Sequence, residues 1–311
     1  MSEQKQLTFD SIVVLGPTAT GKTNLAVKIA DKFYGEIISA DSRQVYKDLN
    51  IGTGKDLDEY KIKNKFIPYH LIDIVNPMEE YNVSRFQKDF EKVFNLIKKK
   101  NKLPILCGGT GFYIKAVLMN FQIPEIKPDK KLRSKLEEYS LASLIQKLDK
   151  ISPDYKKNNP VDSKRRVIRA IEVKLQSEDK SSNKNSLTPV IKKPLIIGIK
   201  YAREIIRERI TKRLMERIDN GMVDEVSELM QNDVTEERLF NLGLEYRYIS
   251  KYLIGEYSRE EMIIKLNTAI HQFAKKQMTF FRNMEKNGIK INWISTGNIL
   301  DVIALINQKN N

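Results

Sequence analysis

The stretch Gly16-Pro17-Thr18-Ala19-Thr20-Gly21-Lys22-Thr23 fits the pattern G-x-x-x-x-G-K-[ST] at every fixed position. It follows residues 12–15, an apolar run that predicts a buried strand. Residues 24–33 after it predict a helix with apolar side chains on one side. A glycine-rich turn between strand and helix directs backbone N–H groups into one hollow, where the helix N-terminus adds partial positive charge. The sequence therefore predicts a phosphate-binding loop.

Two side chains of this loop have predicted roles in holding a phosphorylated ligand. Lys22 can reach the outer phosphate, and the Thr23 hydroxyl can ligate Mg²⁺. The loop alone does not identify the reaction, because kinases, ATPases and transferases that release diphosphate all use it.

Composition narrows the class of protein. The chain has 311 residues, of which 41% are hydrophobic and 30% charged, and its net charge is +14. This predicts a globular protein with two domains, or one core with a large insertion. No apolar run is long enough to span a bilayer, and residues 1–10 lack the apolar core of a signal peptide. A single cysteine, Cys107, excludes an intrachain disulfide and a cysteine zinc site. We expect a cytoplasmic location and no membrane contact.

Strand and helix patterns alternate in the first third of the chain. Strands are expected at 36–40, 70–74 and 104–107, and a helix at 84–99 with Ser84 as its cap. This order is typical of a parallel sheet covered on both faces. The fold class expected is therefore α/β, with a core like that of P-loop NTPases.

After about residue 122 helical periodicity dominates, with helices expected at 130–139, 141–149 and 164–176. Strand character returns at 194–201. We therefore expect a core of residues 1–122 plus 194–311, interrupted by an inserted helical domain at 123–193.

The last third of the chain predicts further helices. One runs over 203–230 with a break at Asn220-Gly221, and a second runs over 259–285. Residues 289–294 predict a last strand. The inward side chains expected on the second helix are Met262, Ile263, Leu266, Ile270, Phe273 and Phe281.

The positive charge is concentrated in the predicted insertion. Residues 127–193 carry 18 lysines and arginines against 9 aspartates and glutamates, an excess of nine. A basic segment of this kind suits a polyanion larger than a nucleotide. The alternative is a solvated surface in a lysine-rich chain.

Two further polar turns should lie beside the phosphate loop. Asp41 directly follows the second expected strand, and Gly108-Gly109-Thr110-Gly111 follows the strand at 104–107. The carboxyl ends of parallel strands share one edge of the sheet, where ligands bind. Asp41 could act as a general base, hold Mg²⁺ through water, or cap the next helix with Ser42. The second turn could approach a substrate base, or be only a tight turn.

The order of motifs resembles the signature set of tRNA dimethylallyltransferases, also called isopentenyl-tRNA transferases. The resemblance covers about residues 11–296 and rests on more than the phosphate loop. The other motifs are D-S-R-Q-V-Y at 41–46, I-G-T-G-K at 51–55, H-L-I-D at 70–73, G-G-T-G-F-Y at 108–113, R-R-V-I-R-A-I-E at 165–172, G-L-E-Y-R at 243–247 and Q-F-A-K-K-Q-M-T-F-F-R at 272–282.

The resemblance implies a reaction. A dimethylallyl group would move from dimethylallyl diphosphate to N6 of adenosine 37, next to the anticodon of a tRNA, and diphosphate would leave. The phosphate loop would bind the prenyl diphosphate with Mg²⁺, and Lys22 would stabilise its charge. Asp41 is similar to the family's base, Thr18 would donate to the bridging oxygen, and Thr110 would contact the target nucleotide. Arg209 and Arg213, one helical turn apart, could reach the diphosphate or form a solvated helix face.

A tRNA anticodon stem-loop is the implied partner, and a monomer is expected. The target base must be splayed out of its stack to reach the pocket. The residues implied in tRNA binding are Asp41, Ser42, Arg43, Gln44, Thr110, Arg133, Arg165, Arg166, Arg169, Gly243, Tyr246, Arg247, Lys275, Lys276 and Gln277.

The sequence departs from the family pattern in the late helix and before the arginine helix. Ile270 and His271 stand where Thr-Arg is more usual, Lys276 replaces Arg, and Phe280 replaces Trp. Residues 162–164 replace the usual Asn-Asp-Pro style lead. Two other activities fit the phosphate loop, an isopentenyltransferase acting on free adenylate and a P-loop kinase. The basic insertion argues against the first, since a free nucleotide needs no such surface.

Overall fold

The strand that precedes the phosphate loop lies inside a six-stranded sheet. In the computed structural model, which describes residues 8–62, 64–120, 126–177 and 190–310, the strand order is β5-β2-β6-β1-β7-β8. Neighbouring strands are parallel, and Leu15 at the end of β1 is opposite both Gly108 and Gly198. The strands are β1 (Ser11–Leu15), β2 (Gly35–Ser39), β5 (Tyr69–His70), β6 (Leu103–Gly108), β7 (Pro194–Ile199) and β8 (Asn292–Ile294).

The chain forms two compact units, Met1–Phe121 with Pro189–Asn311, and Gln122–Thr188. The sheet belongs to the first unit, and a short hairpin of β3 (Lys61–Ile62) and β4 (Lys65–Phe66) accompanies it. The helices of the first unit are α1 (Lys22–Phe33), α2 (Val83–Lys99), α3 (Gly111–Leu118), α8 (Arg203–Arg217), α9 (Val223–Gln231), α10 (Glu236–Leu242), α11 (Leu244–Leu253), α12 (Arg259–Lys286) and α13 (Ile299–Asn310), with short helical turns η1 (Leu57–Tyr60) and η2 (Ile218–Met222).

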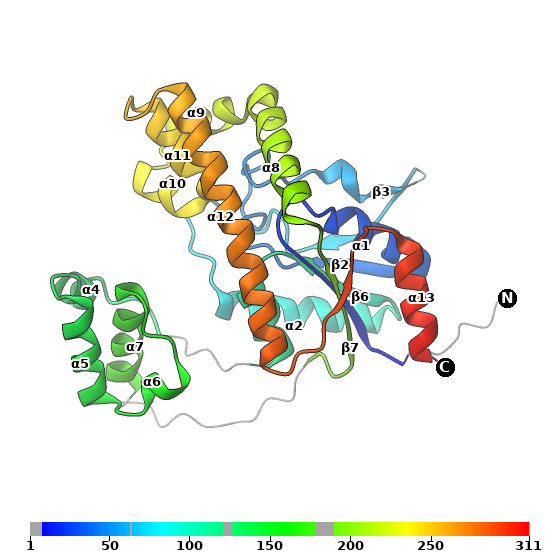
Figure 1. The fold of residues 1–311 in the computed structure, drawn as a ribbon, viewed down its shortest axis with the longest axis horizontal. Coiled ribbons are helices and arrows are strands. Elements are labelled where there is room, and N and C mark those ends of the chain that lie inside the picture. The colour runs from blue at the N-terminus through cyan, green and yellow to red at the C-terminus, as the bar shows by residue number, and fades with distance from the viewer. Residues whose placement is uncertain (1–7, 63, 121–125, 178–189, 311) are drawn as a thin grey trace. The chain divides into compact units, whose positions relative to one another are not determined.

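Helices cover both faces of the sheet, because its strands are apolar on both sides. Ile12 and Val14 pack on one face with α1 and α13. Val13 and Leu15 pack on the other face with α2, α3, α8 and α12. Figure 1 shows the long helix α12 to one side of the sheet strands and α13 to the other, with α1 next to α13. This confirms the predicted α/β class with a parallel sheet.

The second unit is a small helical domain with its own core. Its helices are α4 (Lys130–Glu137), α5 (Leu141–Ile151), α6 (Tyr155–Asn158) and α7 (Lys164–Ser177). Leu144, Leu148, Val167 and Ile171 form its buried centre. The insertion was expected at 123–193, whereas the structure places Ile191 in the core of the first unit.

Several local predictions need correction. The strand expected over 70–74 ends at His70, because Leu71 and Asp73 adopt positive φ values of 62° and 54° that break the extended chain. Asn82 caps α2 in place of Ser84, since its side chain accepts from two backbone N–H groups. The strand expected from 289 begins at Asn292. Phe273, expected inward, is 44% exposed.

Candidate active site

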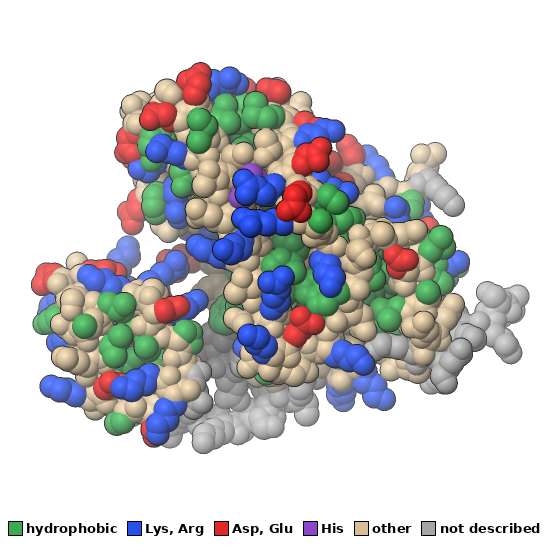
Figure 2. Space-filling model, in the orientation of Figure 1, with side chains coloured by type: hydrophobic (Ala, Val, Ile, Leu, Met, Phe, Trp, Pro, Cys, Tyr) green, Lys and Arg blue, Asp and Glu red, His purple; other side chains and the backbone are tan. Residues whose placement is uncertain are grey.

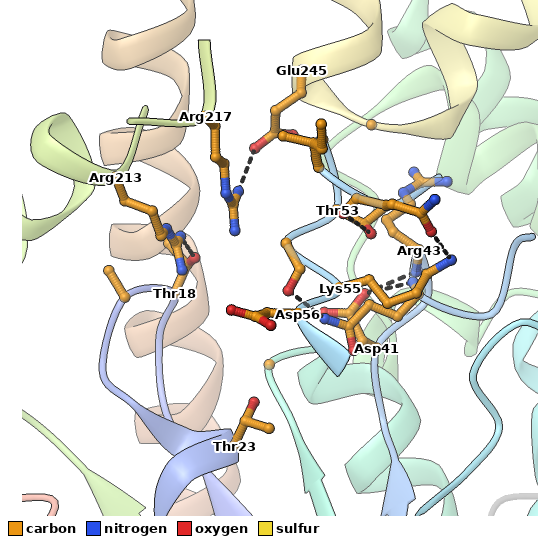
Figure 3. A pocket seen from close by; sticks show the side chains of 18 of the residues that line it. Thr18, Thr23, Asp41, Arg43, Thr53, Lys55, Asp56, Arg213, Arg217 and Glu245 are labelled. Carbon is orange, nitrogen blue, oxygen red and sulfur yellow. Dashed lines mark hydrogen bonds and ion pairs between the residues drawn. The ribbon is translucent and has the colours of Figure 1, made fainter. Parts of the chain in front are cut away.

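A pocket of about 1030 Å³ opens at the carboxyl ends of the strands in the first unit. The phosphate loop leads from β1 into α1, and the Asp41 turn and the Thr110 turn follow β2 and β6. Parallel register therefore brings together residues that are far apart in the sequence. Figure 3 shows that Arg213 and Arg217 of α8 point into this space, across from Asp41. The lining also includes residues 50–60, residues 242–247 and part of α12.

Lys22 and Thr23 are the first two residues of α1, so the N-terminus of the helix faces the pocket. The Lys22 Nζ donates to the Pro17 carbonyl at 2.7 Å, which holds its side chain back over the loop. Burial, together with the nearby charge of Arg213, lowers the pKa of Lys22 to about 8. The Thr23 side chain hydrogen-bonds Glu59. The loop thus presents a cation and a hydroxyl to a phosphorylated ligand.

Of the two arginines predicted to reach the diphosphate, the structure brings only Arg213 to the pocket. Its guanidinium donates to the Thr18 hydroxyl. Burial, together with the charge of Arg217, lowers the pKa of Arg213 to about 10. Arg209 does not line the pocket, because its guanidinium lies over the ring of Tyr201, 4.2 Å from the centroid.

Arg217 is a pocket cation that the sequence analysis missed. It lies one turn beyond Arg213, lines the pocket and faces Glu245, with 4.0 Å between Nη1 and Oε1. The spacing of four between Arg209, Arg213 and Arg217 was the available signal, but it does not show which pair faces inward. Glu245 was missed too, although it lies inside the G-L-E-Y-R motif. Lys22, Arg213 and Arg217 together make this side of the pocket suited to a multiply charged anion.

Asp41 shapes the turn after β2 with one of its carboxylate oxygens. Its Oδ1 accepts from the backbone N–H of Arg43 at 2.8 Å and of Gln44 at 3.4 Å. These two bonds form an Asx turn, which orients the side chain. Both described hydrogen bonds of this carboxylate use Oδ1, so Oδ2 is left to accept a proton. Asp41 therefore combines a turn-forming role with a position suited to a base.

The Thr110 turn is held directly against the Asp41 turn. A Cβ on Gly108 would lie 2.3 Å from the Ala40 carbonyl, so only glycine permits this approach. The Ala40 carbonyl accepts from the Thr110 N–H at 3.2 Å. The Thr110 hydroxyl in turn accepts from the Ser42 N–H at 3.0 Å. The glycine turn thus has a packing reason, and it places Thr110 beside Asp41.

Residues 50–55 form a fixed loop on another side of the pocket. The Glu225 carboxylate accepts from the N–H groups of Asn50, Ile51 and Gly52 at 2.8, 2.6 and 3.0 Å. The Tyr246 hydroxyl donates to the same carboxylate at 2.7 Å. Tyr246 is fully buried. Tyr246, which was predicted to contact tRNA, therefore supports the loop from the protein interior. Glu225 was not predicted, because nothing near it in the sequence marks a ligand site.

Other residues predicted to bind tRNA also have partners inside the protein. Arg247 donates to the Phe240 carbonyl at 2.9 and 3.1 Å, and its guanidinium lies over the Phe240 ring. Gln277 is 8% exposed and hydrogen-bonds two loops. Gln44 donates to the Gly54 carbonyl at 3.2 Å. Gly243 separates α10 from α11 in an extended conformation and lines the pocket.

Lys275 and Lys276 lie on the outward side of α12, and both are exposed. Figure 2 shows several Lys and Arg side chains gathered over the part of the surface that α12 and α8 form. Arg43 lines the pocket, where burial lowers its pKa from the ordinary arginine value. These three cations remain available for an anionic partner.

The arginines of the second unit divide into two groups. Arg133 and Arg169 both bind Glu172, whose side chain is fully buried. The Arg133 bonds to its two oxygens are 3.0 and 2.8 Å long. Burial opposes ionisation of Glu172, but the hydrogen bonds from the two arginines lower its pKa to about 2. Arg133 and Arg169 thus neutralise a carboxylate buried in the domain, and the phosphate contacts expected of them stay a prediction.

Arg165 and Arg166, by contrast, are exposed on α7. Among the residues that the structure describes, the Arg166 guanidinium pairs with the exposed Asp162, one turn earlier, at 2.7 and 2.8 Å. Exposed pairs of this kind are worth at most about 1 kcal/mol. The Arg166 guanidinium can therefore exchange that partner for a phosphate.

In the part of the chain that the structure describes, no group of three or more His, Cys, Asp or Glu side chains is arranged to hold a metal. None of the described helices has the length and apolar character needed to cross a membrane. Cys107 is buried, and burial raises the pKa of its thiol to about 12. This thiol stays protonated and is unsuited to act as a nucleophile.

Comparison with known proteins bears on what this pocket does. Residues 44–284 match the family model of IPP transferase, and residues 10–66 match that of isopentenyl transferase. The tRNA dimethylallyltransferase 1 of Azobacteroides pseudotrichonymphae genomovar. CFP2 is 49% identical over 290 residues, which cover 92% of this chain and 93% of that relative. The tRNA dimethylallyltransferase 1 of Parabacteroides distasonis is 46% identical over 289 residues, 92% of each chain.

Solved structures give the same picture. The tRNA isopentenylpyrophosphate transferase of Bacillus halodurans superimposes with a TM-score of 0.69 at 30% identity, over 97% of both chains. A eukaryotic dimethylallyltransferase acting on tRNA gives a TM-score of 0.76 at 26% identity, over 96% of this chain and 78% of that one. The similarity therefore extends through the core and the insertion alike.

Proposed function

The chain belongs to the IPP transferase family and is a tRNA dimethylallyltransferase, and we propose that it transfers the dimethylallyl group of dimethylallyl diphosphate to N6 of adenosine 37 in the anticodon stem-loop. One observation carries this proposal. A single pocket joins a phosphate loop with three cations to a carboxylate at the end of the neighbouring strand. A diphosphate donor needs the phosphate loop and the cations, and an amine acceptor needs the carboxylate.

The chemistry follows from the placement of the residues. The allylic C–O bond of the donor breaks and diphosphate leaves with the bonding electrons. Lys22, Arg213 and the backbone amides of the loop stabilise the charge that develops on it. The lone pair of N6 forms the new C–N bond, and Asp41 takes the proton that N6 loses.

Thr18 and Arg213 act as a pair in this scheme. Arg213 donates to the Thr18 hydroxyl, which leaves that hydroxyl's own proton for the bridging oxygen of the donor. Arg217 adds a further positive charge from the next turn of α8. Arg217 lies between Arg213 and Glu245 along the wall of the pocket, so the positive side of the pocket reaches as far as Glu245.

A magnesium ion fits the donor set of this pocket. Mg²⁺ is commonly held by one or two protein oxygens together with phosphate oxygens and water. The Thr23 hydroxyl would supply a protein oxygen, and Glu59, which hydrogen-bonds Thr23, would orient it. The ion would neutralise charge on the departing diphosphate.

The tRNA would reach the site as an extruded base, because a stacked adenine cannot enter the pocket. Thr110 lies beside Asp41, where it can contact the target nucleotide. Exposed cations on α12 and α7, including Lys275, Lys276, Arg165 and Arg166, would bind the RNA backbone. We also propose that the protein is a monomer and acts in the cytoplasm. Sedimentation of the purified protein would test whether it is a monomer.

The direct test is an assay with purified protein, dimethylallyl diphosphate and an unmodified tRNA anticodon arm. Mass analysis of the digested RNA should show isopentenyladenosine, and diphosphate should appear in equal amount. The same assay with AMP should give little product. Faster turnover of AMP, or release of the γ-phosphate of ATP without prenyl transfer, would overturn the proposal.

A further inference from the structure

Gln277 occupies a position on α12 that the helix pattern would give to an apolar side chain. The inward row around it consists of Ile270, Ala274, Phe281 and Met284. Gln277 is itself only 8% exposed. A buried amide destabilises a protein unless its polar atoms are hydrogen-bonded. The amide in this row therefore depends on specific partners.

The two ends of the Gln277 amide bind two different loops. Its Oε1 accepts from the backbone N–H of Thr18 at 2.8 Å, and its Nε2 donates to the Gly109 carbonyl at 2.9 Å. A flipped amide would place donor against donor and acceptor against acceptor, so only one orientation satisfies both loops. One planar group thus connects the phosphate loop with the turn that carries Thr110.

We propose that Gln277 is a positioning residue, which fixes the spacing between the loop that binds the donor diphosphate and the turn that receives the target nucleotide. This inference rests on the proposed function. The two reacting atoms belong to ligands held by these two loops, so a shift of either loop misaligns them. A misplacement of about 1 Å can lower a rate about 10²-fold.

The inference separates Gln277 from the exposed cations of the same helix. Lys275 and Lys276 face outward and are placed to bind RNA, whereas Gln277 faces the loops. Replacing Gln277 should therefore lower kcat and leave tRNA affinity within about twofold of wild type. If Gln277 instead touched the RNA, its loss would weaken tRNA binding and leave kcat almost unchanged.

Gln277→Glu gives a readout that a packing role would not produce. An ionised carboxylate can accept from Thr18 but has no proton to donate to Gly109, whereas a protonated carboxyl supplies both an acceptor and a donor. Burial favours the protonated form. The ratio of variant to wild-type kcat should therefore rise at least threefold between pH 8 and pH 6. A ratio that does not change with pH would contradict the proposed pair of bonds.

Gly109→Ala tests the same contact from the other side. A Cβ on Gly109 would lie 2.5 Å from the Gln277 Nε2, and the next atom outside Gln277 is the Gly16 carbonyl oxygen at 3.6 Å. We expect Gly109→Ala to lower kcat about as much as Gln277→Ala, roughly 10-fold to 100-fold. When Gln277 is already alanine, adding Gly109→Ala should lower kcat less than twofold. Independent losses that multiply in the double variant would overturn the proposal.

Controls keep this test separate from the proposed function and from folding. Gln272→Ala changes an exposed glutamine on the same helix and should keep wild-type kcat. Gln277→Met keeps the length of the side chain without its polar atoms, so it serves if the alanine variant unfolds. Absence of prenyl transfer by the wild-type protein would refute the proposed function. Wild-type activity with unchanged kcat in both Gln277→Ala and Gln277→Met would refute only this inference.

Discussion

Burial and a bound anion act on the charge of Lys22 in opposite directions. In the free pocket, burial lowers its pKa to about 8, with the charge of Arg213 as a further cause. A bound diphosphate favours the protonated amine and raises that pKa again. Binding above pH 8 must therefore take up a proton, whereas binding below pH 8 does not.

We predict that affinity for dimethylallyl diphosphate falls as pH rises above 8, approaching tenfold per unit, and is insensitive to Lys22 ionisation below 8. Titration of the ligand by calorimetry between pH 7 and pH 10 would measure this. Lys22→Arg is the control, because arginine stays charged and reports the ionisation of the ligand itself. An equally steep fall in that variant would show that Lys22 is not the titrating group.

One substitution can separate the two roles of Asp41, which are to hold the turn and to act as the base. Asparagine keeps the oxygen that accepts from the Arg43 and Gln44 N–H groups, but it cannot take a proton. We predict that Asp41→Asn lowers kcat by about 10²-fold or more, within the range for loss of a general base.

Donor affinity and thermal stability should stay near wild type in Asp41→Asn, as followed by equilibrium binding and thermal unfolding. Loss of donor binding would identify Asp41 as the partner of Mg²⁺. Retention of activity within threefold would remove it from the chemistry. Asp41→Ala would lose turn and base together, so it is the less informative variant.

At the scale of elements, the sequence predicts the phosphate loop better than it predicts the inward side of α12. The loop could be predicted because its glycines, lysine and threonine have fixed spacing between a strand and a helix. On α12, periodicity placed Phe273 inside, but its side chain is 44% exposed. Periodicity also gave no sign that the buried Gln277 hydrogen-bonds two loops. Residue type predicts burial only where the facing surface is apolar.

The loop at 50–55 depends on an element far along the chain. Glu225 of α9 satisfies three of its backbone N–H groups and receives the Tyr246 hydroxyl. Glutamine at this position would turn one acceptor into a donor that faces other donors. We predict that Glu225→Gln lowers the free energy of unfolding by about 1–3 kcal/mol.

The same variant should also lower kcat, since the loop lines the pocket. Chemical denaturation and steady-state kinetics would measure the two effects. Glu228→Gln on the same helix is the matched control, because Glu228 is exposed. If both variants behaved alike, the loop would not depend on this carboxylate.

At the scale of the whole molecule, the order of motifs predicts the family and the fold, but charge counting does not predict which cations are free. The excess of positive charge at 127–193 pointed to RNA binding. The structure shows that Arg133 and Arg169 neutralise a carboxylate buried in the domain core. The burial of Glu172 could not be predicted from the sequence, because a glutamate in a basic helix is usually expected at the surface. Partners 39 residues apart become visible only when the helices are packed.

This division of the arginines gives a prediction for tRNA binding. Arg165→Ala and Arg166→Ala should each weaken binding and reduce the slope of log affinity against log salt by about 0.7–0.9, the value for one phosphate contact. Arg133→Ala should act differently, because it leaves the buried Glu172 with one partner fewer. We expect it to destabilise the inserted domain by about 1–3 kcal/mol, because Arg169 and the Asp129 N–H still bind Glu172.

Filter binding of tRNA from 50 to 300 mM salt, together with chemical denaturation of the full chain, would separate the two effects. At low temperature, where Arg133→Ala remains folded, its salt slope should equal that of wild type. A reduced slope in this variant would mean that Arg133 also contacts phosphate. An unchanged slope in both Arg165→Ala and Arg166→Ala would instead move the RNA-binding surface away from α7, and leave the exposed lysines of α12 as the cations to test next.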